Sequence, residues 1–440
     1  MDGRAPKSLN LSRFAWRRAV CALLLTIPVM SLTSLERPLD EDVEHLSGVS
    51  HSSDVVMRVR IVRDTMEMEF AAEGGLRVSD LRSMGRNGRT MASPIRVRLA
   101  GSKFRVRGGD GRTRTYSTED ALRVAPMRGQ IRMGDAAFPG FMALHLRDDG
   151  RGFDVIEHVP LESYLPGVLS KELYPGWSDT AYEAQAIAAR SYAMHERERR
   201  LSIGSSFDVE STTQDQAYGG SDASEKARNA VRATRGQILT YQGALLRAYY
   251  SSTCGGHPGS ARDTWPIGRG FEFNLAAPIQ AVPRACPCDF SPRYRWTTNR
   301  STSELARRFR AFGADQGMAI RSIRSIQSIK PERMNAAQRP ARYRIMDADG
   351  DSWRLSGEEL RLALNHNGSS GLGRPDQQDM AWSGDVEIEI ESGRASLQGR
   401  GFGHGVGMCQ FGAEGLARQG RTAHEILALY YPGADISTMY

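Results

Sequence analysis

The sequence predicts an α+β fold in which a helical segment that carries the candidate chemistry is combined with β-rich portions. Residues 56–150 alternate apolar and polar side chains between glycine-rich turns, a pattern typical of half-buried strands. Residues 161–200 instead carry small and apolar side chains at helical spacing. A chain of 440 residues is long enough to hold more than one domain.

The first 34 residues have the pattern of an export signal. Three arginines precede an apolar run, Ala19–Met30, that is too short for a comfortable membrane span. No small-x-small cleavage site follows, so an uncleaved N-terminal anchor is the alternative. Residues 35–55 are polar and acidic without periodicity, as in a linker. We therefore expect an exported, envelope-facing protein that meets the membrane only through this N-terminal segment.

The formal net charge of +7 comes almost wholly from arginine. Nucleic-acid-binding proteins usually cluster their basic residues on one face, whereas here the arginines are interleaved with acidic residues. Nucleic acid is therefore not an expected partner. A basic chain suits a polyanionic cell-envelope substrate, and a simple bias toward arginine explains the excess equally well.

Two helices are predicted next. The stretch LESYLPGVLSKELYPGW predicts one helical turn broken at Pro166, and then a helix that ends before Pro175. Thr180 and Glu183 have the spacing of a capping box ahead of a second helix. One face of that helix consists mostly of alanine, with Gln185 as its one amide, and a buried amide needs hydrogen-bond partners.

Residues 297–390 are polar and have the composition of an inserted unit. Ser301 with Glu304, and Ser356 with Glu359, have capping-box spacing, and Gly313 is expected to end the first of these helices. MAIRSIRSIQSI and ARYRIM, between the two helices, are predicted strands. The sequence DADGD that follows fits a hairpin turn, because its glycine is misplaced for a calcium-binding loop.

Three stretches of uncommon sequence occur in a fixed order. They are LESYLPGVLSKELYPGW with AYEAQAIAARSYA; FDVESTTQDQAYGG with AVRATRGQILTYQGALLRAYYSSTCGGHPGSARDTW; and GRGFGHGVGMCQFGAEGLARQGRTAHEILALYYPG. In this order they resemble the sporulation stage II protein D (SpoIID) family, whose domain is shared with the LytB amidase enhancers. The resemblance covers about residues 156–296 and 396–433, on either side of the polar insert.

The resemblance implies a lytic transglycosylase that acts on peptidoglycan glycan strands, with Glu172 as its catalytic acid. Such an enzyme uses one glutamate twice: it protonates the glycosidic oxygen and then accepts the proton of the sugar's 6-hydroxyl, which closes a 1,6-anhydro ring. No cofactor is required for this chemistry. The residues alone leave another interpretation open, in which Glu172 is a surface acid paired with Lys171 or Arg190.

The resemblance also implies a substrate-binding set. Hydroxyl, amide and carboxylate groups with interspersed aromatic rings are the composition of a sugar-binding groove, although an ordinary polar loop has a similar composition. The expected substrate-binding residues are Gln185, Arg190, Tyr192, Asp208, Ser211, Thr212, Gln216, Tyr218, Tyr250, Ser252, His404 and Gln410.

Glycine occupies every second position from Gly399 to Gly407. This alternation does not fit an ordinary strand, because glycine has no side chain to pack and loses the most conformational freedom on ordering. Something must approach the backbone closely there. Two hypotheses explain the glycine segment equally well. It forms a wall of the glycan cleft beside Glu172, with His404 touching substrate or orienting the glutamate, or it forms a tight packing seam within the domain.

The cysteines offer a metal site. Cys254 and His257, followed about thirty residues later by Cys286 and Cys288, form a plausible four-ligand set for structural zinc. Cys409 lies in the glycine segment and is left out of this set. In an exported protein the alternative is a disulfide between Cys254 and one of the later two cysteines, which leaves an odd thiol.

The predicted organisation is an export signal or anchor (1–34), a linker (35–55), a β-rich module (56–150) and a SpoIID-like catalytic domain (151–440) with the insert at 297–390. Two other functions stay open. A non-catalytic envelope protein of the amidase-enhancer type would keep the fold and stimulate a separate cell-wall amidase. A structural envelope protein would use the β-rich module for contacts. Sporulation itself does not follow from the resemblance.

Overall fold

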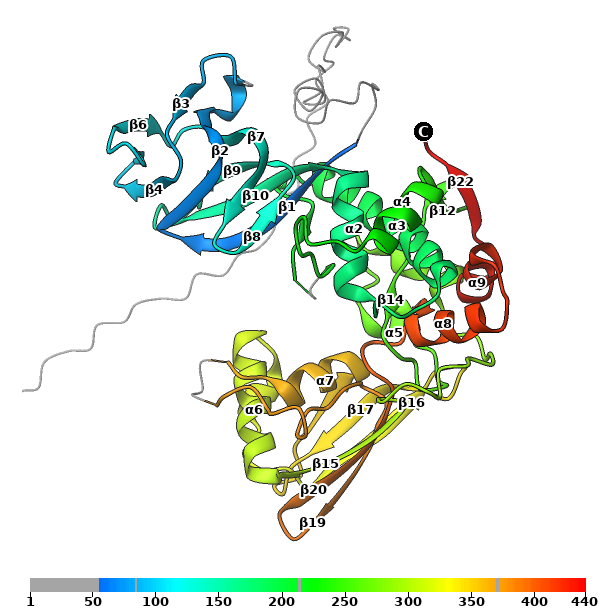
Figure 1. Cartoon of the computed structure of the whole chain (residues 1–440). Helices are drawn as coiled ribbons and strands as arrows, with labels where there is room; N and C mark the ends of the chain where they lie inside the picture. Colours follow the sequence, from blue (N-terminus) through cyan, green and yellow to red (C-terminus); the bar gives the residue numbers. More distant parts are fainter. Residues whose placement is uncertain (1–54, 84, 213–214, 369–371) are drawn as a thin grey trace, which may run out of the picture. The chain divides into compact units, whose positions relative to one another are not determined.

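The computed structural model describes residues 55–83, 85–212, 215–368 and 372–440, and these all lie within one compact unit, residues 39–440. A run of strands alone is followed by parts in which helices and strands are mixed, which confirms the predicted α+β class (Figure 1). The predicted export segment lies outside the described residues. Within the described ranges, no helix is both long enough and apolar enough to cross a bilayer.

The N-terminal part of this unit is one large sheet with the strand order β11-β1-β10-β9-β7-β2-β4-β5-β6, in which β3 also pairs with β2, and β8 with β7. Its strands are β1 (Val56–Thr65), β2 (Glu67–Asp80), β3 (Arg89–Met91), β4 (Ile95–Ala100), β5 (Lys103–Gly108), β6 (Thr113–Ser117), β7 (Leu122–Met133), β8 (Ala136–Phe138), β9 (Phe141–Leu146), β10 (Phe153–Pro160) and β11 (Val209–Glu210). Strands β4 and β5 alternate strictly between buried and exposed residues, as the sequence pattern predicts. The sheet continues past residue 150, since its strand β10 ends only at Pro160. The first helix of the next part begins at the following residue.

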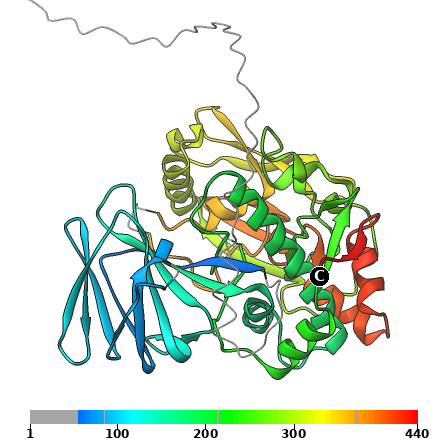
Figure 2. The ribbon, with the colours of Figure 1, turned by 90° about the horizontal axis from the view of Figure 1, so that it is seen from above.

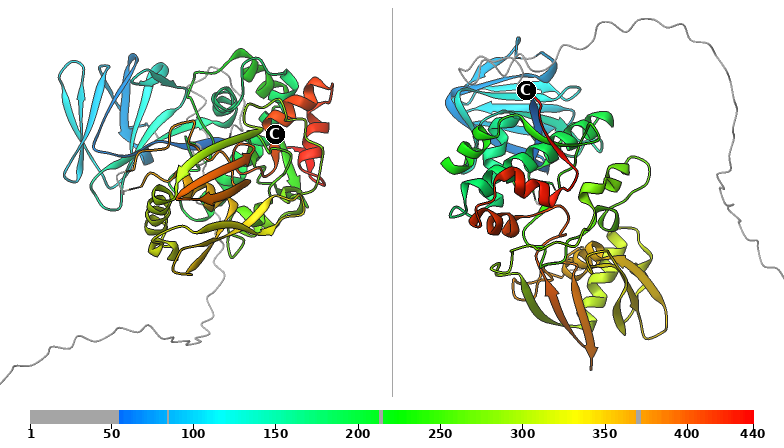
Figure 3. Two further views of the ribbon diagram at one scale, coloured as in Figure 1. Left: turned by 90° about the horizontal axis from the view of Figure 1, so that it is seen from below. Right: turned by 90° about the vertical axis from the view of Figure 1, so that its right-hand side faces the viewer.

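That next part is built around helices. They are α2 (Leu161–Glu172), α3 (Asp179–Ser202), α4 (Glu225–Ala233), α5 (Ala261–Thr264), α8 (Gln410–Arg418) and α9 (Ala423–Tyr430). The C-terminal helices α8 and α9, red in Figure 3, pack against α3 and share its hydrophobic cluster. The alanine-rich face of α3 permits this close packing, because the small methyl side chains let the backbones of neighbouring helices approach one another.

Short strands join chain segments that are far apart in sequence. In one small sheet, β12 (Gln237–Tyr241) pairs with both β13 (Ala244–Leu245) and the C-terminal strand β22 (Asp435–Thr438). In the other, β14 (Tyr250–Ser251) runs parallel to β21 (Met408–Cys409). The second pairing brings the second and third of the unusual sequence stretches into contact.

Two predictions about these helices are wrong. Helix α2 is continuous through Pro166, because its buried leucine, valine and tyrosine side chains hold it against the core despite the missing N–H. Helix α3 begins at Asp179 after the N-cap residue Ser178, so Thr180 lies inside the helix and forms no capping box with Glu183. Instead, the Ser178 N–H donates to the Glu414 carboxylate at 2.8 Å.

The insert contains its own hydrophobic cluster and two three-stranded sheets, which appear in yellow and orange in Figure 2. Its elements are β15 (Arg295–Ser301), α6 (Thr302–Asp315), β16 (Ser328–Met334), β17 (Pro340–Met346), β18 (Ser352–Ser356), α7 (Gly357–Asn365), β19 (Val386–Glu391) and β20 (Arg394–Arg400). Short 3₁₀ turns complete the described elements: η2 (Leu81–Ser83), η3 (Glu272–Leu275), η4 (Ala277–Ile279) and η5 (Ala319–Ser322).

The predictions within the insert have mixed outcomes. Ser356 and Glu359 form a complete capping box. Ser301 caps α6 through its hydroxyl, although the Glu304 carboxylate binds two arginines instead of closing the box. Gly313 lies inside α6 and does not end it. Of the two predicted strands, ARYRIM is confirmed as β17, whereas MAIRSIRSIQSI is mostly a 3₁₀ turn and loop that buries its isoleucines. DADGD forms the β17–β18 hairpin turn.

Candidate active site

Glu172 is the last residue of α2, and its half-buried carboxylate is held by two neutral donors. The Ala217 backbone N–H donates to Oε1 at 3.1 Å, and the Gln410 amide donates to Oε2 at 3.2 Å. Burial raises the pKa of Glu172, and these two hydrogen bonds partly oppose the rise because they favour the charged form. Neither Lys171 nor Arg190 binds this carboxylate, since they pair with Asp222 and Glu162 respectively.

Four other predicted residues form two hydrogen-bonded groups, of which one includes Glu172 and the other adjoins it in the chain through Ala217. The Gln410 amide also reaches the Gln185 carbonyl oxygen at 3.5 Å, while the Gln185 amide nitrogen is buried without a hydrogen-bond partner. Gln216 accepts from the Tyr164 hydroxyl at 3.1 Å and donates to the Tyr250 hydroxyl at 3.0 Å. Gln216 directly precedes Ala217, so the same loop positions both the second group and the donor to Glu172.

Two predicted substrate-binding residues are taken up by buried ion pairs. The fully buried Arg190 guanidinium binds both oxygens of Glu162, at 2.8 and 2.9 Å, and so joins α3 to α2. Asp208 is also fully buried, and it accepts from the backbone N–H and the guanidinium of Arg58 on β1. These charges are satisfied inside the protein, where each ion pair joins two segments of the fold, and the expected contact of both residues with substrate stays a prediction.

The remaining predicted substrate-binding residues of the first two stretches make the following contacts. The Tyr192 hydroxyl donates to Asp215 and accepts from Arg247, both at 3.0 Å. The Tyr218 ring packs on Tyr164, with 4.7 Å between ring centroids. Among the others, Ser211 is half-buried and bonds through its backbone, Thr212 is exposed, and the Ser252 carbonyl oxygen accepts from the Phe411 N–H.

The glycine segment forms a packing seam against residues 249–255. Gly401, Gly403, Gly405 and Gly407 all adopt positive φ, between 71° and 91°, so this part of the alternation forms neither a strand nor a helix. Gly399, contrary to the prediction, lies in strand β20, where a Cβ would overlap the Trp296 ring. A Cβ on Gly407 would overlap the Tyr249 carbonyl oxygen, and one on Gly401 would overlap the Thr253 carbonyl oxygen. Glycine is therefore required here for close backbone approach, as the packing-seam hypothesis expects.

His404 lies in this seam with its ring on Trp265, at 4.9 Å between ring centroids. Its Nδ1 accepts from the Val406 N–H at 3.0 Å. Burial lowers the pKa of His404 to about 4, so the ring is neutral near pH 7. The hydrogen bonds of Glu172 come from Ala217 and Gln410, so His404 does not orient the glutamate directly.

The structure changes the predicted cysteine cluster by one member. Cys254, Cys286, Cys288 and Cys409 bring their sulfur atoms within 4.8 Å of one another. His257 is not part of this group, because its Nδ1 lies 3.1 Å from the Asp385 carboxylate and its ring also contacts Arg400.

Sequence reasoning missed three groups. Ala217 acts through its backbone, which leaves no signal in the residue type. Asp215 is a half-buried acid whose pKa is raised by desolvation, and it lies in a polar loop that gave no signal. Cys409 was set aside with the glycine segment; its position one residue before Gln410 and ahead of a helix could have drawn attention to it.

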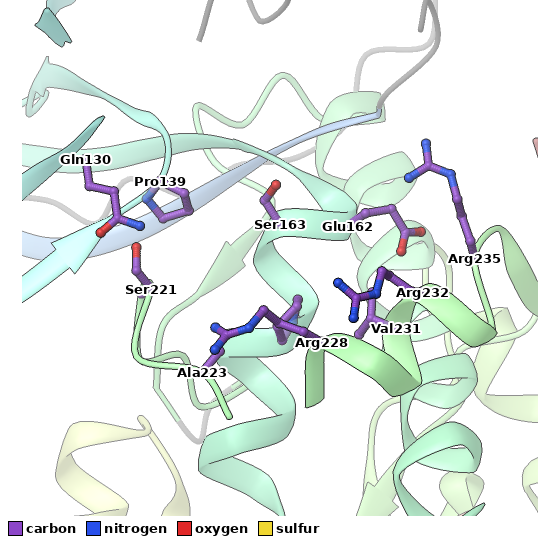
Figure 4. A pocket seen from close by; sticks show the side chains of 12 residues that line it. Gln130, Pro139, Glu162, Ser163, Ser221, Ala223, Arg228, Val231, Arg232 and Arg235 are labelled. Atoms are coloured by element: carbon purple, nitrogen blue, oxygen red, sulfur yellow. The ribbon is translucent and has the colours of Figure 1, made fainter. Parts of the chain in front are cut away.

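A cavity of about 600 Å³ lies apart from this network, between the sheet and helices α2 and α4 (Figure 4). Figure 4 shows Arg228, Arg232 and Arg235 near Glu162 on its wall. Neither Glu172 nor any other predicted site residue lines this cavity. We therefore place the candidate active site at Glu172, on the basis of the network around its carboxylate.

The fold and site define an α+β protein with one half-buried glutamate held by neutral donors from two distant segments. A family model described as Stage II sporulation protein matches residues 149–241, which include Glu172, Gln185 and Gln216. Together with the relatives below, this match confirms the resemblance to the SpoIID/LytB family.

Three relatives share a larger part of the chain. An uncharacterized protein of Brachyspira hyodysenteriae is 28% identical over 283 residues, which cover 64% of this chain and 68% of its own. Stage II sporulation protein D of Bacillus amyloliquefaciens is 28% identical over 301 residues, 64% of this chain and 75% of its own. Amidase enhancer of Bacillus subtilis is 26% identical over 298 residues, 62% of this chain and only 40% of its own.

Proposed function

We propose that this chain acts in cell-wall metabolism at the envelope as a lytic transglycosylase of peptidoglycan glycan strands, with Glu172 as the acid and base. The observation that carries the proposal is the environment of Glu172: burial favours its protonated form, and its two hydrogen-bond partners are neutral. An acid with a raised pKa can still hold its proton near neutral pH. The names of the relatives, Stage II sporulation protein D and Amidase enhancer, support a role in wall metabolism.

The reaction needs one carboxyl group. Protonated Glu172 gives its proton to the glycosidic oxygen as the bond from that oxygen to C1 of the muramic acid breaks. The 6-hydroxyl oxygen of the same sugar then bonds to C1 and returns its proton to Glu172, which regenerates the acid and leaves a 1,6-anhydro end. Most glycosidases instead place a second carboxylate across the scissile bond, whereas the groups bonded to Glu172 are an amide and a backbone N–H.

The test is digestion of purified glycan strands, with and without stem peptides, read by mass spectrometry. Glu172→Gln keeps the size of the side chain and removes the exchangeable proton, so we expect anhydro-muramic products from the wild type and at least 100-fold less from the variant. Glu183→Gln is the matched control, because Glu183 is also half-buried with a pKa raised by burial but lies outside the network. Loss of product in both variants, or in neither, would contradict the assignment of Glu172.

The relative named Amidase enhancer favours a second candidate function, in which the chain stimulates a cell-wall amidase without cutting glycan itself. Wild-type protein that gives no product on either substrate, but accelerates the release of stem peptides by an added amidase, would establish this function. In that outcome Glu172→Gln would still stimulate the amidase.

A further inference from the structure

Three distant segments bring four cysteines to one point beside the candidate active site. Cys254 follows β14, Cys286 and Cys288 lie in a loop, and Cys409 is the N-cap residue of α8. All four sulfur atoms lie within 4.8 Å of one another, and those of Cys254 and Cys288 are 3.8 Å apart. Four thiolates around zinc at about 2.3 Å form a tetrahedron whose edges are about 3.8 Å. The Cys254–Cys288 separation therefore matches one edge of that tetrahedron, and the other sulfur pairs lie no more than 4.8 Å apart.

From this geometry we propose that Cys254, Cys286, Cys288 and Cys409 bind one structural zinc ion as a four-thiolate site. Four sulfur ligands in a tetrahedral arrangement are typical of zinc and of iron bound to sulfur, and the metal analysis below separates the two. Two disulfides would instead need only two bonded pairs, each with its sulfur atoms about 2.05 Å apart, and the two pairs would not have to lie close to each other.

The surroundings of the sulfurs supply the hydrogen bonds that metal-bound thiolates accept. Cys409 Sγ accepts from the backbone N–H groups of Cys254 and Gly412, both at 3.3 Å. The Tyr430 hydroxyl lies 3.2 Å from Cys286 Sγ, where it can donate. Such donors around the ligands fix their orientation and spread the negative charge of the site.

Helix α8 is shaped to receive the loop that carries two of the ligands. A Cβ on Gly412 would overlap Cys286 Sγ, and a Cβ on Gly415 would overlap the Pro287 carbonyl oxygen. Between Trp265 and β15 the chain forms only two 3₁₀ turns, η3 and η4, so this irregular segment has few backbone ladders to hold it. A metal site gives it a fixed anchor against α8.

The first experiment measures the metal content of the purified full-length protein by inductively coupled plasma mass spectrometry, and we expect one zinc ion per chain. Replacing zinc with Co²⁺ in the wild type should give the visible and charge-transfer bands of tetrahedral cobalt thiolate, a readout that needs no variant. Metal-free protein whose intact mass shows two disulfides would overturn the proposal, as would stoichiometric iron.

Variants then identify the fourth ligand. Cys409→Ser should lose at least 90% of the zinc, while His257→Ala, the matched control from the alternative ligand set, should keep it. Cys409→His retains a ligand and should still bind zinc with a changed Co²⁺ spectrum, which separates a ligand role from a failure to fold. Zinc retained in Cys409→Ser and lost in His257→Ala would overturn the assignment of the site. None of these readouts depends on the proposed catalytic activity.

Discussion

Gly407 and Gly403 provide a matched pair that tests the packing seam. Both residues have positive φ, 71° and 91°, so alanine at either position costs about 1–2 kcal/mol of backbone strain. The two sites differ in what a Cβ would meet. At Gly403 it would lie 3.2 Å from the Ser251 Cβ, a tight contact that a small shift relieves. At Gly407 it would overlap the Tyr249 carbonyl oxygen.

The overlap at Gly407 adds a cost that can be counted. The Tyr249 carbonyl oxygen accepts from the Met408 N–H at 3.0 Å and from the Tyr431 hydroxyl at 2.7 Å. Displacing this oxygen breaks both hydrogen bonds, at about 1 kcal/mol each. We therefore expect Gly407→Ala to lower the free energy of unfolding by about 3–4 kcal/mol, against about 1–2 kcal/mol for Gly403→Ala.

The assay is urea unfolding of wild type and both variants, followed by tryptophan fluorescence and compared at equal m-value. Scanning calorimetry gives a second reading, since each kcal/mol corresponds to about 2–4 °C in the midpoint for domains of this order of size. Equal losses in the two variants, within about 0.5 kcal/mol, would refute the reasoning, because the close approach to Tyr249 would then carry no energy. A loss only at Gly403 would likewise contradict it.

Three further predictions concern charged and polar groups. Gln410→Met removes a donor to Glu172 and should raise the pKa of that carboxyl further, measured by ¹³C NMR titration of labelled glutamate; an unchanged or lowered pKa would contradict the network. Glu157 is fully buried, and burial raises its pKa from 4.5 to about 7, so the stability it contributes is present below pH 4.5 and is lost as the pH rises through 7. The stability of Glu157→Gln relative to wild type should therefore increase from pH 5 to pH 8, by roughly 3 kcal/mol at most. Thermal unfolding in which the difference between variant and wild type does not change with pH would exclude this. Arg190→Met removes the guanidinium from the half-buried Glu162 carboxylate, which keeps the Tyr440 hydroxyl as a donor, and should cost up to about 3–5 kcal/mol, part of which Glu162→Gln should restore in the double variant; additive losses would contradict the pairing.

The sequence alone predicted the α+β class because strand and helix periodicities lie in separate parts of the chain. Helical periodicity also singled out Gln185 as the one amide on an apolar face, whereas Glu172 was assigned through resemblance to a family, since periodicity does not show which polar residues meet. What failed was local: Pro166 was expected to break a helix, yet tertiary burial of the surrounding apolar residues kept it intact. The intrinsic helix propensity of a residue predicts little about helix boundaries wherever tertiary packing of this kind is available.

The roles of charged residues were harder to predict from the sequence than the positions of buried apolar residues. Arg190 and Asp208 have the side chains of a sugar-binding groove, and nothing in their residue type shows that a partner carboxylate or guanidinium lies within hydrogen-bonding distance inside the fold. Cys409 was missed for a related reason, because its partner Cys254 is 155 residues away in sequence. Ligand sets that assemble from distant segments leave no spacing signal.

The glycine segment, the cysteine cluster and Glu172 form one continuous chain of contacts. Gly407 lets the backbone approach Tyr249 closely, and two residues later Cys409 caps α8 with its sulfur in the four-cysteine cluster. The next residue, Gln410, donates to Glu172. A carboxyl that acts first as an acid and then as a base works best when its pKa lies near the operating pH. Burial raises the pKa of Glu172, and the donor fixed at the start of α8 opposes that rise together with the Ala217 N–H.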